Sequence, residues 1–132
     1  MKTKFYVNKD ARTVVCVISG TRHFFQEWIW THCNNILKYF RNSIFPEMPN
    51  SFVGRAVCAP EDEWNEDLGR LIAHSRARNK LYTSFFKRAN AITDKLDMTI
   101  ENMVQRINQY GQYLEDKRIG TEQRIASFNK EE

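Results

Sequence analysis

The sequence predicts an α+β fold: a small three-stranded antiparallel sheet with one inserted aromatic helix, followed by a long helix or helical hairpin with a heptad seam. Stretches rich in β-branched residues occur near both ends of the segment 1–58, and an aromatic stretch with helical spacing separates them. A long stretch without internal proline follows over 60–118, with apolar residues three or four positions apart. We expect a single domain, residues 1–132, because a chain of this length can bury one modest core.

The sheet is predicted from three short segments. Residues 4–8 and 12–19 are rich in β-branched and aromatic types, which favour strands. They flank the turn-like cluster Asn8-Lys9-Asp10-Ala11, and the pattern indicates a β-hairpin. Because an isolated hairpin is marginally stable, residues 52–58 are expected to form a third strand that completes the sheet.

Apolar and mostly aromatic residues recur at spacings of three and four over 22–41. This pattern predicts an amphipathic helix, inserted between the second and third strands, that covers one face of the sheet. Two prolines make the following segment, 42–51, a loop. Trp28 and Trp30 lie about 200° apart on such a helix, so both cannot face the same core. Trp30 is therefore a candidate interface aromatic, and burial by a dimer partner or by the loop is the alternative.

The long helix is expected to begin at Pro60, because the missing N–H of proline would have no intrahelical partner in a first turn. The acidic residues that follow Pro60 would stabilise the positive end of the helix dipole. Gly120 predicts the end of the helix, and the tail 120–132 is polar.

From Phe85 onward the apolar residues form a heptad seam, which needs another helix to bury it. The predicted self-association residues are Phe85, Ile92, Leu96, Met103, Ile107, Tyr110 and Leu114. A break near Thr93-Asp94 would fold the two halves into a hairpin, because either residue can cap a new helix. Without a break, the seam requires a partner chain and predicts a homodimer. Both arrangements stay open at this point.

A run of basic residues without any acidic one is the most informative functional feature. It comprises Arg70, Arg76, Arg78, Lys80, Lys87 and Arg88. At helical spacing such a stripe can meet phosphates at regular intervals, and the net charge of +4 suits an anionic partner. A plain solvated face is the commonest role of such runs, and contact with a membrane surface is a further alternative. No helix-turn-helix pattern accompanies the run, so the sequence does not indicate a specific transcription factor.

The histidines and cysteines do not have the paired spacings of a structural zinc site. The acidic cluster has a structural explanation at a helix start, and the isolated glycines do not form a phosphate-binding loop. We therefore expect no metal, no cofactor and no catalysis, since no nucleophile, base and orienting group can be assembled. An odd number of cysteines, three, and the short apolar runs predict a cytoplasmic protein without a membrane segment.

The strand-to-helix junction resembles a pattern found in small proteins of bacteriophages and prophages of Gram-positive hosts. The residues that carry it are Gly54-Arg55-Ala56-Val57-Cys58-Ala59-Pro60-Glu61-Asp62-Glu63-Trp64, continued by Gly69-Arg70-Leu71-Ile72-Ala73 and Arg76-Ala77. The resemblance covers residues 1–19 and 52–90. The segment 22–51 and the heptad tail are additions in this chain, and the motif transfers no catalytic residue.

Such a phage setting implies a counter-defence protein, such as an anti-CRISPR protein that binds an RNA-guided nuclease. The expected partner is a bacterial defence nuclease or its guide RNA, contacted through the basic stripe together with Trp30. One alternative is a homodimeric non-specific nucleic-acid-binding protein that contacts DNA or RNA directly. A further alternative is a protein that sequesters a signal nucleotide.

Overall fold

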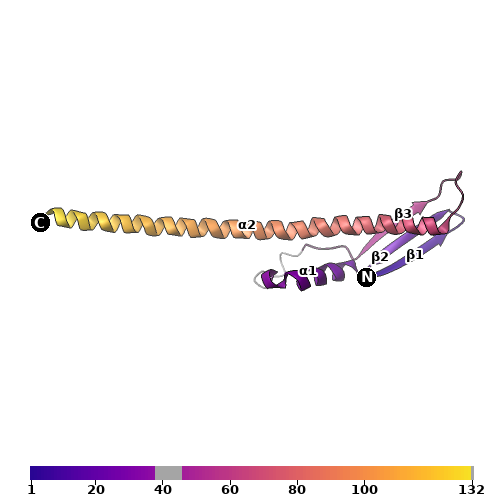
Figure 1. Ribbon diagram of the computed structural model, residues 1–132, viewed down its shortest axis with the longest axis horizontal. Helices are drawn as coiled ribbons and strands as arrows, with labels where there is room; N and C mark the ends of the chain where they lie inside the picture. The colour runs from indigo at the N-terminus through magenta and orange to yellow at the C-terminus, as the bar shows by residue number, and fades with distance from the viewer. Residues whose placement is uncertain (38–45, 132) are drawn as a thin grey trace. The chain divides into compact units, whose positions relative to one another are not determined.

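The computed structural model describes residues 1–37 and 46–131, and it has the α+β class that the sequence predicts (Figure 1). Its elements are, in order, β1 (Lys2–Asn8), β2 (Thr13–Ser19), α1 (Thr21–Leu37), β3 (Ser51–Val57) and α2 (Glu66–Glu131). The chain divides into two compact units, Met1–Thr93 and Asp94–Glu132. Each unit is described by itself below.

The three strands form one antiparallel sheet in the order β1-β2-β3, so the predicted hairpin and third strand are confirmed. Phe5 lies opposite Cys16, which in turn lies opposite Gly54. The hairpin turn is closed by the Asn8 side chain, whose Oδ1 accepts a hydrogen bond from the Ala11 N–H at 3.0 Å. Arg12 leaves the turn with a left-handed φ of 51°.

The core of the first unit lies between the sheet and the start of α2. Side chains alternate along a strand, so Val14, Cys16 and Ile18 all point to one face and are buried there. Gly54 lies on the same face of β3, where a methyl group would overlap the backbone carbonyl oxygen of Ala73 on α2. Only a residue without Cβ permits this close approach of helix and strand.

The expectation that the inserted helix covers a sheet face is wrong, because α1 lies past the end of the strands and, of the described helices, only α2 lies on the sheet (Figure 1). Helix α1 instead lies beside α2 (Figure 1). The Phe25 ring of α1 meets the Phe85 ring of α2 edge-on at a centroid distance of 5.2 Å. Phe25 is fully buried in this contact. Residues 38–41 of the predicted helix and 42–45 of the predicted loop lie outside the described residues.

Helix α2 begins at Glu66 and not at Pro60. Asn65 sets this start, because its Oδ1 accepts a hydrogen bond from the Leu68 N–H at 3.0 Å and so caps the first turn. The predicted hairpin alternative is also wrong, since the helix continues through Thr93. The Thr93 hydroxyl donates to the Asn90 carbonyl at 2.8 Å and does not cap a new helix.

The helix passes Gly120 as well, so the predicted end there is wrong. The Thr121 hydroxyl donates to the Lys117 carbonyl at 3.0 Å, and an Arg118–Glu122 ion pair at 2.7 Å spans the glycine. The Arg118–Glu122 pair adds a little helix stability where glycine removes it. The structure thus contains the long-helix form of the predicted fold.

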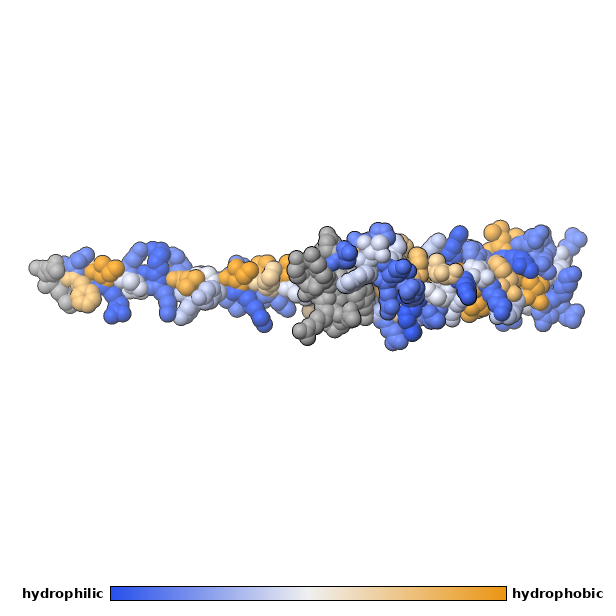
Figure 2. All heavy atoms as spheres, turned by 90° about the horizontal axis from the view of Figure 1, so that it is seen from below, coloured by the Kyte–Doolittle hydropathy of each residue, from blue (hydrophilic) through white to orange (hydrophobic). Residues whose placement is uncertain are grey.

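In the second unit, large apolar side chains of α2 are exposed at regular intervals. They are the orange spheres along the narrow left part of Figure 2. Among them, Met103, Ile107, Tyr110 and Leu114 are each about half to two-thirds exposed. No helix in residues 1–37 and 46–131 combines the length and the apolar character needed to cross a membrane.

Candidate nucleic-acid interface

Three cations of the predicted basic stripe line one shallow hollow on α2. Lys87 and Arg88 lie seven and eight positions after Lys80, two helical turns on, and thus on the same side of the helix. Asn79, Thr83 and Ser84 complete the lining among the described residues, and the hollow has a volume of about 420 Å³. We call these six residues the basic hollow.

The cations beside β3 are held in place by the strand itself. Among the described residues β3 is an edge strand, so one row of its backbone groups has no neighbouring strand there. Lys80 Nζ donates to the Val53 carbonyl at 2.8 Å, and Arg76 Nη1 donates to the Arg55 carbonyl at 2.6 Å. These hydrogen bonds use one donor of each side chain, whereas an ammonium group has three and a guanidinium group five. Both residues remain exposed, so their other donors point to solvent.

Arg88 has a similar anchor at the other end of the hollow. Its Nε donates to the Glu47 carbonyl at 2.6 Å, and its Nη1 contacts the Ser84 hydroxyl. The segment around Glu47 is held further by Arg22, whose Nε donates to the Met48 carbonyl at 2.8 Å. Lys87 is exposed beside this anchored cation.

The remaining two cations of the stripe lie outside the hollow. Arg70 pairs with Glu66 at 3.3 Å, and its guanidinium lies 5.2 Å from the centre of the Phe5 ring. Arg78 lies 5.9 Å from the centre of the Tyr82 ring and lines a different cavity. The structure therefore brings together half of the six predicted cations, with Arg76 next to them along β3.

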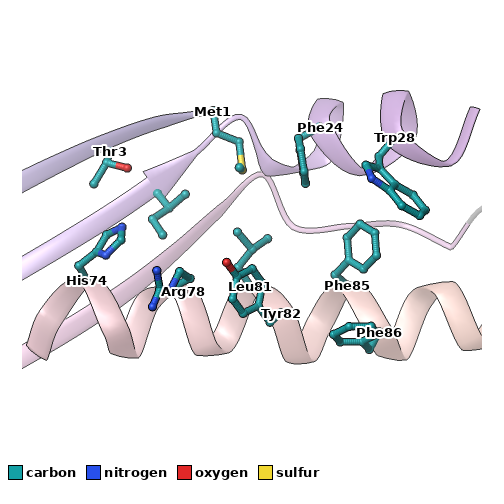
Figure 3. Close-up of a pocket in the computed structure, with 11 residues that line it drawn as sticks. Met1, Thr3, Phe24, Trp28, His74, Arg78, Leu81, Tyr82, Phe85 and Phe86 are labelled. Atoms are coloured by element: carbon teal, nitrogen blue, oxygen red, sulfur yellow. The ribbon is translucent and has the colours of Figure 1, made fainter. Parts of the chain in front are cut away.

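The cavity that Arg78 lines is an apolar groove of about 440 Å³ between the helices and the sheet (Figure 3). Phe24 and Trp28 of α1 point toward Phe85 of α2, whereas Phe86 lies on another side of α2 (Figure 3). The Trp28 and Phe85 rings meet edge-on at 5.4 Å. Since these rings hold α1 against α2, the groove is part of the packing between the two helices.

Trp30, the aromatic residue predicted to lie at an interface, belongs to α1 and is about half-exposed. It lines neither the basic hollow nor the apolar groove among the described residues. Its role at an interface stays a prediction.

The predicted self-association residues divide between the two units. Phe85 and Ile92 belong to the first unit, where Phe85 contacts α1 and Ile92 is buried. Leu96 is half-buried, whereas the later seam residues, from Met103 onward, are exposed. Contact with a second chain stays a prediction for the exposed part.

Side-chain contacts hold the junction between β3 and α2 in place. Arg12 Nη2 donates to Cys58 Sγ at 3.1 Å and to the Ala59 carbonyl at 3.1 Å. The same guanidinium contacts the Asp62 carbonyl. Together with Gly54, these contacts fix the path from β3 into α2.

Cys16, a thiol of the core, lies outside the lining of the hollow. Burial raises the pKa of the Cys16 thiol, which belongs to the core. Within residues 1–37 and 46–131, no three His, Cys, Asp or Glu side chains gather as ligands for a metal ion. Comparison of the chain with protein-family models, with curated proteins and with solved structures found no match.

Sequence reasoning grouped the cations by their spacing but missed the neutral lining of the hollow. Asn79, Thr83 and Ser84 sit at the same helical spacing as the cations and would have emerged from a helical-wheel projection. The backbone anchors on β3 and near Glu47 leave no such signal, because they depend on tertiary contacts. Chemically, the hollow combines fixed positive charge with hydroxyl and amide groups.

Proposed function

We propose that this protein is a non-enzymatic inhibitor of a bacterial nucleoprotein defence enzyme, and that it binds phosphates of the enzyme's nucleic acid in the basic hollow. One observation carries the proposal: Lys80, Lys87 and Arg88 line a single hollow without an acidic residue in its lining. Charge-assisted hydrogen bonds to phosphate are among the strongest that side chains make. The phage-type pattern at the start of α2 supports an RNA-guided nuclease as the target, in the bacterial cytoplasm.

The anchored cations favour phosphate binding for an entropic reason. A long basic side chain loses rotamer freedom when it binds a ligand, at roughly 0.5–1.5 kcal/mol per side chain. Lys80 and Arg88 have already lost part of that freedom, because each is hydrogen-bonded to a backbone carbonyl. The surrounding charge also favours an anion, since α2 contains no acidic residue between Asp67 and Asp94.

The test is a pull-down of the tagged protein from lysate of a phage-susceptible host, with and without nuclease treatment. Lys87→Glu is the informative variant, because Lys80 and Arg88 also anchor the fold. We expect this variant to lose the partner while its melting curve stays unchanged. The matched control is Arg106→Glu, an equally exposed charge reversal in the second unit.

Capture of one nucleoprotein enzyme that is lost with Lys87→Glu, and weakened when the enzyme's nucleic acid is digested, supports the inhibitor. Full capture by Lys87→Glu, with a normal melting curve, contradicts the role of the hollow. Capture of mixed nucleic acid without one enriched enzyme, lost when the nucleic acid is digested, favours the second candidate, a homodimeric non-specific nucleic-acid-binding protein.

The exposed seam in the second unit is the observation that favours this second candidate. Its apolar side chains have no partner within the described residues, and an isolated helix gains little stability without packing. A second copy that packs along Ile107 and Leu114 would bury them. The homodimeric binder predicts affinity for free DNA or RNA that falls steeply with added salt.

A further inference from the structure

The sheet has a second face, opposite the one that α2 covers. Strand alternation places on it the residues that neighbour the core positions. They are Lys2, Lys4, Tyr6 and Asn8 of β1, Thr13, Val15, Val17 and Ser19 of β2, and Ser51, Val53, Arg55 and Val57 of β3. We call this set the outer sheet face. Tyr6, Val53 and Val57 are each 44–61% exposed, so no described element covers it.

The outer sheet face is basic and aromatic. Its charged residues are Lys2, Lys4 and Arg55, and the set contains no acidic residue. Tyr6, Val15 and Arg55 form one cross-strand row. Lys4 lies 5.3 Å from the centre of the Tyr6 ring, which places a cation beside an exposed aromatic surface.

This face adjoins the basic hollow across the edge of β3. Lys80 of the hollow is hydrogen-bonded to Val53, and Arg76 is hydrogen-bonded to Arg55. Val53 and Arg55 present their side chains on the outer sheet face while their carbonyls hold the cations of α2. A path of positive charge therefore runs from the hollow over the strand edge to the sheet.

We propose that the outer sheet face binds single-stranded RNA, with a base stacked on Tyr6 and phosphates near Lys2, Lys4 and Arg55. The inference rests on the proposed function, because it names the form of nucleic acid that contacts both the hollow and the sheet. A single exposed aromatic ring beside cations on an open sheet suits an unpaired base, whose face is free to stack.

Two features distinguish this ligand from other polyanions. A duplex hides its base faces in the stack, so Tyr6 and the exposed valines would gain nothing from it. Ser19 and Ser51 are paired across the strands at the end of the face that carries Lys2. Their hydroxyl groups supply hydrogen-bonding partners for ribose 2′-hydroxyls, which DNA lacks.

The test measures fluorescence anisotropy of a labelled oligouridine titrated with the full chain, at several salt concentrations. Tyr6→Ala is expected to weaken binding about tenfold, the usual loss when one stacked base loses its aromatic partner. Tyr6→Phe keeps the ring and should bind as the unchanged chain does. The matched control is Tyr113→Ala, since Lys117 lies 5.1 Å from the Tyr113 ring in a similar pair on the second unit.

Loss with Tyr6→Ala, rescue by Tyr6→Phe and no effect of Tyr113→Ala support the proposal. Unchanged affinity of Tyr6→Ala, or tighter binding of a duplex, overturns it, and equal binding of oligodeoxyuridine overturns the assignment to RNA. The proposed function fails separately, when Lys87→Glu keeps its nucleoprotein partner. Lys87→Glu could lose the partner while Tyr6→Ala keeps its affinity for the oligouridine. That result would support the role of the hollow and contradict RNA binding by the outer sheet face.

Discussion

Helix α2 has two stretches, 66–93 and 94–131, that are stabilised in different ways. The first carries small residues toward the sheet, and its Ala73 and Ala77 are fully buried. The second has exposed apolar side chains and local ion pairs, such as Arg118 with Glu115 at 2.6 Å. Both stretches are helical. Helix formation alone therefore does not reveal whether a helix is stabilised by tertiary packing or by local ion pairs.

The largest difference is expected from a single added methyl group. Gly54→Ala should lower the free energy of unfolding by about 3 kcal/mol or more, because the new Cβ would overlap the Ala73 and Ala77 backbone. Gly111→Ala in the second stretch meets no atom within 4 Å and should raise helix stability by about 1 kcal/mol. Urea denaturation followed by circular dichroism measures both. Equal effects of the two substitutions on stability would contradict the idea that the two stretches of α2 are stabilised in different ways.

A neighbouring pair of phenylalanines tests the aromatic contact within the first stretch. Phe85→Ala should destabilise the protein by about 3 kcal/mol, because the ring contacts Phe25 and Trp28 of α1. Phe86, which is 64% exposed, serves as the control, and Phe86→Ala should cost well under half as much. Thermal unfolding curves give the comparison. A larger loss of stability from Phe86→Ala than from Phe85→Ala would contradict the expected order of the two rings.

The second stretch is tested by a charge in its seam. Ile107→Glu should abolish dimers and reduce helix content, because it places like charges at a position that packs against its counterpart in a coiled coil. Gln105→Glu adds the same charge on another side of the helix and should leave the mass unchanged. Light scattering coupled to size-exclusion chromatography reports the mass of each variant. A monomeric parent chain would rule out the seam as an interface.

The smallest effect is expected from the exposed ion pairs. A hydrogen bond from Arg118 lowers the pKa of Glu115 below its ordinary value of 4.5. At a pH above its ordinary pKa, the ionised Glu115 contributes its full stabilisation to the helix. That contribution is lost as the pH falls through the lowered pKa. Circular dichroism between neutral and acidic pH should therefore show a slight loss of helix content. Arg118→Ala should remove this component of the change.

The sequence predicts the sheet well, because β-branched residues and the turn cluster at Asn8 are local signals. The start of α2 was misplaced because Pro60 and Asn65 both favour a helix N-terminus, and the side-chain cap formed at Asn65. The position of α1 was wrong for a different reason. An apolar face indicates that a helix packs, but not whether it packs on a sheet or on Phe85 of another helix.

The candidate site was predicted in part. Helical spacing placed Lys80 and Lys87 on one side of α2, as the basic hollow shows. Spacing could not show that Arg76, Lys80 and Arg88 contact backbone carbonyls, because those partners are distant in the sequence. The outer sheet face was missed although the alternation of Lys4 and Tyr6 with core residues is visible in the sequence.

The hydrogen bonds on the free side of β3 have a consequence for solubility. Unpaired carbonyls at a sheet edge invite strands of other molecules, and this pairing is a common route to aggregation. Lys80 and Arg76 occupy the carbonyls of Val53 and Arg55, so an incoming strand would have to displace two charged groups. At the opposite edge, β1 carries Lys2 and Lys4, which disfavour strand addition by charge. Cations at both edges of the sheet therefore disfavour its extension by strands of other molecules.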